Sequence, residues 1–128
     1  MACRLTEVVI DCHDPRTLAD FWRQVLGYQV VEELDEIIEI GPKPPNPADI
    51  RQGPVPPVLT FIKVPESKGV KNRLHLDVSP TGDSQSEQLD RLLALGARRI
   101  DIGQGDQPWV VLADPEGNEF CLLSTLAP

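Results

Sequence analysis

Apolar side chains follow a helical spacing in two parts of the chain and a strand-like, alternating spacing in most others. Between Pro15 and Leu26 they recur every three or four residues, which predicts an amphipathic helix. Asp14 is suited to be its N-cap, and Gly27 is suited to end it in a left-handed conformation. Runs rich in β-branched residues predict four strands around this helix: Leu5–Asp11, Tyr28–Leu34, Ile37–Ile40 and Val58–Val64.

The second half of the chain repeats this order of elements. A capping box at Ser84–Glu87 predicts a second helix, which ends at Leu95-Gly96. Its apolar side is expected to carry Leu89, Leu92 and Leu93. Four strands are predicted around it: Arg73–Val78, Ala97–Ile102, Trp109–Ala113 and Glu119–Ser124.

The repeat predicts the fold class. Gly27 and Gly96 are equivalent residues about 69 positions apart, so each half is a βαβββ module. We expect an α+β protein in which two tandem modules, about 4–64 and about 72–126, form a curved mixed sheet within a single domain of residues 1–128. The helices would cover the outer faces, and the inner faces would enclose a cleft for a small ligand.

One segment departs from this pattern. Seven of the 13 prolines of the chain lie between Pro42 and Pro57, so we expect neither a helix nor a central strand there. A long loop of this kind in a compact domain is typical of a lid or a mobile insertion.

Alternation along the strands predicts which side chains reach the cleft. Glu7 belongs to the less apolar face of its strand, and Arg73, His75 and Asp77 share a face opposite Leu74, Leu76 and Val78. If Cys121 also faces inward, it lies near His75. The expected ligand-binding residues are Glu7, Phe61 (or its neighbour Thr60), His75, Asp77, Trp109 and Cys121.

Composition narrows the function classes. With 20 acidic and 12 basic residues the net charge is −8, which disfavours nucleic acid as a partner. No long apolar run predicts a membrane span, and the start of the chain lacks the apolar block of a secretory signal. Three widely spaced cysteines fit a reducing compartment, so we expect a cytoplasmic protein.

Several motifs together carry a family resemblance. They are Asp11–Pro15, Leu18–Trp22 with Leu26-Gly27, Lys71–Asp77, and the turn Asp114–Asn118 that leads into Glu119–Cys121. In these segments the chain resembles glyoxalase-like members of the vicinal-oxygen-chelate superfamily, which includes bleomycin-resistance proteins. The resemblance implies the glyoxalase/bleomycin-resistance fold and, in its metal-using members, four metal ligands.

The positions that match those ligands here are Glu7, one of Leu59–Phe61, His75 and Cys121. Such a set suits zinc, nickel or iron better than magnesium. Other interpretations of each residue remain open. His75 can be a hydrogen-bonded histidine without a metal, Glu7 a rim carboxylate paired with Arg4 or Arg73, and Cys121 a small buried hydrophobe.

Three classes of function follow. The first is a lyase or isomerase of glyoxalase type, with Glu7 as proton-moving base and a divalent metal on His75. The second is a metal-free module that sequesters a drug or metabolite in the cleft, with the negative charge favouring a cationic ligand. The third is a dimerisation domain, since proteins of this fold can pair as homodimers.

Overall fold

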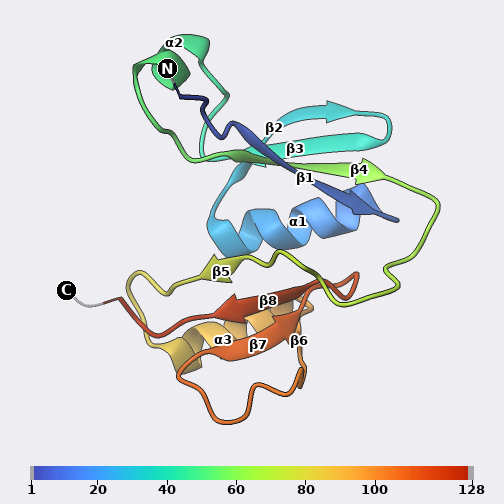
Figure 1. Ribbon diagram of the computed structural model, residues 1–128, viewed down its shortest axis with the longest axis vertical. Coiled ribbons are helices and arrows are strands. Elements are labelled where there is room, and N and C mark those ends of the chain that lie inside the picture. The colour runs from blue at the N-terminus through green and yellow to red at the C-terminus, as the bar shows by residue number, and fades with distance from the viewer. Residues whose placement is uncertain (1, 127–128) are drawn as a thin grey trace. The chain divides into compact units, whose positions relative to one another are not determined.

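The computed structural model describes residues 2–126 and divides into two compact units, Met1–Ser67 and Lys68–Pro128. The first unit contains four strands and two helices in the order β1 (Glu7–Cys12), α1 (Pro15–Leu26), β2 (Gln29–Leu34), β3 (Ile37–Gly41), α2 (Pro47–Gln52) and β4 (Val58–Lys63). Its strands form one sheet, here called sheet A, in the order β1-β4-β3-β2 (Figure 1). β1 runs parallel to β4, and the other pairs are antiparallel.

The second unit repeats this topology. Its elements are β5 (Asp77–Val78), α3 (Gln85–Leu95), β6 (Arg98–Arg99), β7 (Val110–Ala113) and β8 (Glu119–Leu122). The sheet order is β5-β8-β7-β6, again with the first and last strands parallel. The predicted α+β repeat is therefore confirmed at the level of strand order.

α1 forms as the sequence predicts. The Asp14 carboxylate accepts a hydrogen bond from the Thr17 amide at 3.1 Å, and Gly27 ends the helix with φ of 68°. Its buried side places Leu18, Phe21 and Trp22 in the core of the unit. The opposing layer is the apolar face of sheet A, where Ile38, Ile40, Leu59 and Phe61 are at most 5% exposed.

α3 also begins at its predicted cap, where the Ser84 hydroxyl accepts a hydrogen bond from the Glu87 amide at 3.0 Å. Its apolar side is narrower than expected. Leu92 is 1% exposed, but Leu93 is 37% exposed, so its predicted place on the packed side was wrong. Residues 92 and 93 lie about 100° apart around a helix, so the two side chains point in different directions, and only Leu92 is buried.

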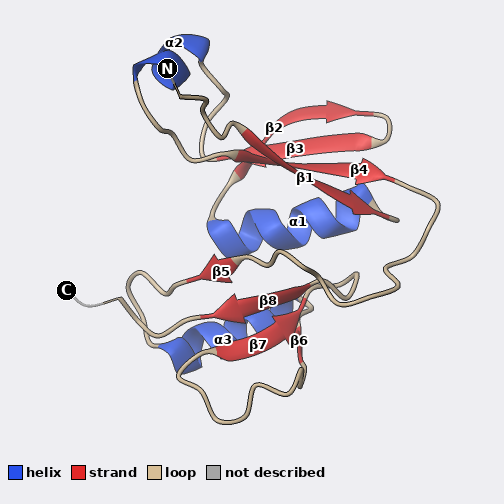
Figure 2. Ribbon diagram, in the orientation of Figure 1, coloured by secondary structure: helices blue, strands red, loops and turns tan. Residues whose placement is uncertain are grey.

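The proline-rich segment contains a helix that the sequence analysis excluded. α2 begins at Pro47, and the Asn46 side chain accepts a hydrogen bond from the Ala48 amide at 2.9 Å (Figure 2). A proline in the first turn of a helix is tolerated because its missing amide hydrogen has no partner there in any case. The prediction that this proline-rich segment contains no helix was therefore wrong, because Asn46 and Pro47 together form a helix start.

The strands of the second unit are shorter than predicted. The first of them covers only Asp77 and Val78 instead of starting at Arg73, and Leu74 is 89% exposed. The ladder to β8 begins where the Cys121 amide donates to the Leu76 carbonyl at 3.0 Å. The residues before Leu76 lie outside this ladder.

The helices are all short. Among residues 2–126, none combines the length and the apolar character that a bilayer crossing requires. Cys3, Cys12 and Cys121 are all free thiols.

Candidate functional site

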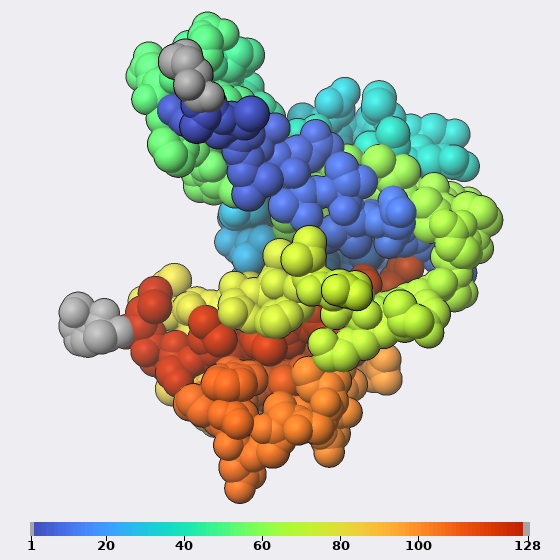
Figure 3. Space-filling model, viewed as in Figure 1, coloured from blue at the N-terminus to red at the C-terminus, as the bar shows by residue number. Residues whose placement is uncertain are grey.

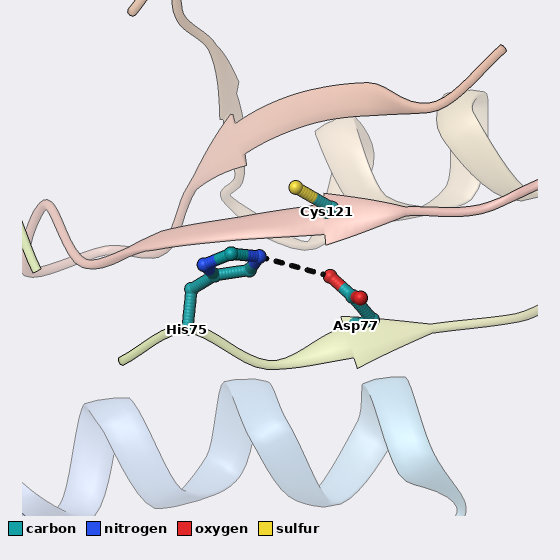
Figure 4. Close-up of side chains that lie close together, drawn as sticks. All are labelled: His75, Asp77 and Cys121. Carbon is teal, nitrogen blue, oxygen red and sulfur yellow. Dashed lines mark ion pairs between the residues drawn. The ribbon is translucent and has the colours of Figure 1, made fainter. Parts of the chain in front are cut away.

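Three potential donor atoms converge in the second unit, on His75, Asp77 and Cys121 (Figure 4). His75 Nε2 lies 3.2 Å from Asp77 Oδ1, and the donor atoms of all three residues lie within 4.8 Å of one another. The side chains of His75 and Asp77 are 44% and 47% exposed, whereas Cys121 is buried. The group is therefore accessible from solvent on one side and closed by protein on the other.

Strand pairing creates this convergence. Asp77 and Cys121 are register partners in the parallel pair β5–β8, so their side chains lie on the same face of the sheet. Phe120 and Leu122 alternate with Cys121 and are each 1% exposed. The buried pair faces the core, and Cys121 consequently lies on the opposite face, beside Asp77.

Glu119 fixes the segment that leads to His75, a role that the sequence analysis missed. Its carboxylate accepts hydrogen bonds from Lys68 Nζ at 2.9 Å and from the Asn72 amide at 3.0 Å. Burial alone would raise the pKa of Glu119, but the bonds from Asn72 and Lys68 outweigh it and lower the pKa below its usual value of 4.5. Glu119 is the first residue of β8, so these two hydrogen bonds fix the position at which the chain enters β5. The sequence signal that could have revealed this role is a charged residue at the first position of an otherwise apolar strand.

The turn before β8 has the geometry that its sequence indicates. Asp114 is 1% exposed, and its Oδ1 atom accepts hydrogen bonds from the amides of Glu116 and Asn118 at 2.9 and 3.0 Å. Gly117 has φ of 89°, which favours glycine. This rigid reversal positions both Glu119 and Cys121.

The surroundings of Cys121 disfavour the thiolate form of its side chain. Burial raises the pKa of the Cys121 thiol above its usual value, and the charge of Asp77 and a hydrogen bond to it raise the pKa further. A nucleophilic cysteine needs the opposite shift and a base next to it. Because Asp77 contacts both other residues, the group is not arranged as a Cys–His–acid catalytic triad.

The donor set does fit a thiophilic divalent metal. Imidazole, carboxylate and thiolate are all zinc ligands, and in tetrahedral zinc sites such donors lie about 3.3–3.6 Å apart. The 3.2 Å separation of His75 and Asp77 is close to that spacing, and Cys121 lies within 4.8 Å of both. A single soft sulfur argues against magnesium, which prefers oxygen ligands in octahedral geometry.

The other predicted site residues belong to other strands or flank them. Glu7 and Phe61 belong to sheet A of the first unit, on opposite faces: Glu7 is exposed, and Phe61 is fully buried against the α1 side. Thr60, the alternative to Phe61, shares the face of Glu7. Trp109 precedes β7 and is 37% exposed. The expectation that Glu7 and His75 line one cleft stays a prediction.

Comparison with known proteins points to one family. A family model described as a glyoxalase-like domain matches residues 7–123. No curated protein matches the sequence.

Solved structures support the same fold. A glyoxalase/bleomycin resistance protein/dioxygenase family enzyme from Burkholderia phytofirmans is 19% identical, with a TM-score of 0.63 over 94% of this chain and 97% of that one. A fosfomycin resistance protein, FosX, from Listeria monocytogenes is 12% identical, with a TM-score of 0.66 over 95% and 91%. At these identities the likeness shows the fold alone.

Proposed function

Since the chain belongs to the glyoxalase-like domain family, we propose that it binds a small molecule and acts on it as a metal-assisted lyase or isomerase, with His75, Asp77 and Cys121 as the metal ligands. The observation that carries this proposal is the convergence of three chemically suited donor atoms within 4.8 Å. Three protein ligands leave a coordination position for water or substrate, which is typical of catalytic zinc sites.

The His75–Asp77 pair has little value as a structural ion pair. Both side chains are nearly half exposed, and exposed pairs stabilise a protein by only about 0–1 kcal/mol. Exposure is useful for a different purpose, because it leaves both donors open to a ligand. A bound divalent cation would supply Lewis acidity that polarises a substrate oxygen.

The three proposed ligands differ in exposure and in position. With a metal bound, Nε2 of His75 and Oδ1 of Asp77, which lie 3.2 Å apart, would both be ligands. Buried Cys121 closes the inner side of the group and excludes water there.

Metal analysis of the purified protein tests the proposal. We expect about one zinc, nickel or iron ion per chain, and cobalt loading should produce thiolate-to-cobalt charge-transfer absorption. His75→Ala and Cys121→Ser should each weaken metal binding by at least about 100-fold, since even outer-shell changes at metal sites weaken binding by about 10–100-fold. Cys121→Ser should also abolish the charge-transfer band.

Matched controls exist because the chain has a second histidine and other cysteines. His13→Gln and Cys3→Ser should leave the metal content unchanged. Metal that survives in both His75→Ala and Cys121→Ser would show that the ligands lie elsewhere.

A metal-free binding protein is the second candidate function. The raised pKa of Cys121 favours it, because a protonated, buried thiol behaves as a small apolar group. In that case the purified protein contains no metal and takes none up, and ligand binding is insensitive to chelators. A homodimer in a reducing, cytoplasmic setting is compatible with both candidates.

A further inference from the structure

The two sheets end in equivalent edge strands of opposite charge. β2 is the last strand of sheet A, and β6 is the last strand of the sheet in the second unit, here called sheet B. β2 contains Glu32 and Glu33, and β6 consists of Arg98 and Arg99. In the described part of the chain neither strand is paired on its outer side, so each edge retains unpaired backbone donors and acceptors.

The charged side chains of both edges are exposed and available to a partner. Within residues 2–126, the side chains of Glu32, Arg98 and Arg99 form no hydrogen bond or ion pair. Glu33 contacts Arg16 of α1, but both side chains are well exposed, and such surface pairs contribute little to stability. A second arginine can therefore compete for Glu33 at little cost.

Glu32 is also held beside another acid. A register shift between Val30 and Glu32 places Glu32 opposite Glu39 of β3. Like charges that face each other across a sheet are unfavourable. Partial burial raises the pKa of Glu39, and the charges of Glu7 and Glu32 raise it further. A cation next to β2 would relieve this repulsion.

Both edges carry exposed apolar side chains as well. Val30 and Leu34 of β2 are 46% and 54% exposed, and Ile102, shortly after β6, is 41% exposed. Figure 3 shows the hairpin of β2 and β3, in cyan, at the surface of its unit. Covering these side chains would add a favourable contribution that salt does not screen.

Charged residues on an edge strand normally prevent sheets from associating through their edges. In this protein they prevent that association only between equal edges. Pairing of two β2 strands would bring four glutamates together, and pairing of two β6 strands would bring four arginines together. Pairing of β2 with β6 instead brings opposite charges together. The charge pattern therefore selects the unlike pair.

The charges of the two edges also match face by face. Glu33 lies on the α1 side of sheet A, and Arg99 lies on the core side of sheet B, because their register partners are buried apolar residues. Glu32 and Arg98 are the preceding residues, so they project from the other face of each sheet. Each edge thus presents one charge on each face.

This arrangement allows both ion pairs to form in one contact. When Glu32 lies opposite Arg98, Glu33 meets Arg99 directly if the strands are parallel and diagonally if they are antiparallel. Direct neighbours across a sheet have Cβ atoms about 4.5–5.5 Å apart, and diagonal neighbours lie about 7–8 Å apart. Glutamate and arginine side chains are long enough to span either distance.

We propose that β2 of one copy of the chain pairs with β6 of a second copy, so that the chains associate head to tail through backbone hydrogen bonds and ion pairs between the two glutamates and the two arginines. Two different surfaces meet in such a contact, so it either closes a ring or extends into an open chain. β6 is only two residues long, and we therefore expect weak, reversible association. The interface contains none of the proposed metal ligands and does not depend on the proposed function.

Sedimentation velocity of the purified protein tests this association. We expect the average sedimentation coefficient to rise between about 10 μM and about 1 mM protein in about 50 mM salt, with a dissociation constant below about 1 mM. About 500 mM salt should weaken the association at least about fivefold, because it screens the ion pairs. Exchange of the backbone amide hydrogens of β2 should slow as the protein concentration rises.

Charge reversal tests which edges meet. Glu32→Arg together with Glu33→Arg makes both edges basic, and Arg98→Glu together with Arg99→Glu makes both edges acidic. Each double variant alone should self-associate at least about tenfold more weakly than the wild type. An equimolar mixture of the two should associate again, because an acidic edge then meets a basic one. The chain with all four substitutions should also self-associate.

A matched control separates the edges from the net charge. Glu66→Arg together with Asp90→Arg changes the net charge by the same amount as reversing both glutamates of β2, at exposed positions away from both edges. The dissociation constant of this variant should stay within about twofold of the wild type. Far-UV circular dichroism checks that every variant is folded.

Three results would overturn the proposal. They are sedimentation that does not depend on concentration up to about 1 mM, unchanged association of either charge-reversed variant, and a mixture of the two reversed variants that associates no better than each alone.

Discussion

Replacing Thr60 by Val is expected to make the protein more stable. Valine has nearly the same shape as threonine but lacks the hydroxyl, which is buried and without a partner. An unsatisfied buried polar group destabilises the folded state by about 1–3 kcal/mol. The free energy of unfolding of Thr60→Val should therefore rise by about 1–3 kcal/mol.

Urea unfolding at neutral pH measures this change. Trp22 lies in the core of the same unit as Thr60, so its fluorescence reports on the relevant part of the chain. A Trp109→Phe background removes the only other tryptophan. Thr17→Val is the control of opposite sign, because the Thr17 hydroxyl donates to Asp14 at 2.7 Å. That variant should lose about 0.5–1.5 kcal/mol.

If Thr60→Val is destabilised as much as Thr17→Val, the hydroxyl of Thr60 is already satisfied and the reasoning is refuted.

Three further predictions concern the stability of Glu119, Glu39 and Gly117 variants. Glu119→Gln should lower the free energy of unfolding by about 1–3 kcal/mol at pH 7, because it removes the charge that binds Lys68 and the Asn72 amide. Since the pKa of Glu119 is lowered, this deficit is complete above pH 4.5 and should shrink as the pH falls through the folded-state pKa in unfolding curves. Glu39→Gln should stabilise the protein at pH 7, because the pKa of Glu39 is raised and its charged form is unfavourable in the folded state. The gain in the free energy of unfolding should disappear below pH 4.5, where the carboxyl is protonated in both states. A gain that persists below pH 4.5 would contradict this explanation. Gly117→Ala should lower thermal stability by about 1–2 kcal/mol because of its positive φ. Gly53→Ala is the control, because Gly53 has an extended φ of 178° and open space around it.

Local features of the fold were accessible from the sequence. Asp14, Pro15 and Gly27 define α1 to the residue, and Ser84 starts α3, because capping depends on groups only a few residues apart. The internal repeat predicted the matching strand order of the two units. His75 and Asp77 were singled out by alternation along their predicted strand, whereas Cys121 was a candidate through the family resemblance.

Other features were decided by long-range contacts. Whether Asp77 lies beside Cys121 depends on the register of β5 against β8, and whether Glu32 joins Glu39 depends on one bulge in β2. The lack of a partner for the Thr60 hydroxyl depends on the residues that β1 and β3 place beside it, Val9 and Glu39. The sequence determines the conformations and contacts that a residue can form within a few positions. Register and burial arise only when distant segments pair, so only the tertiary structure could bring the residues of the candidate site together.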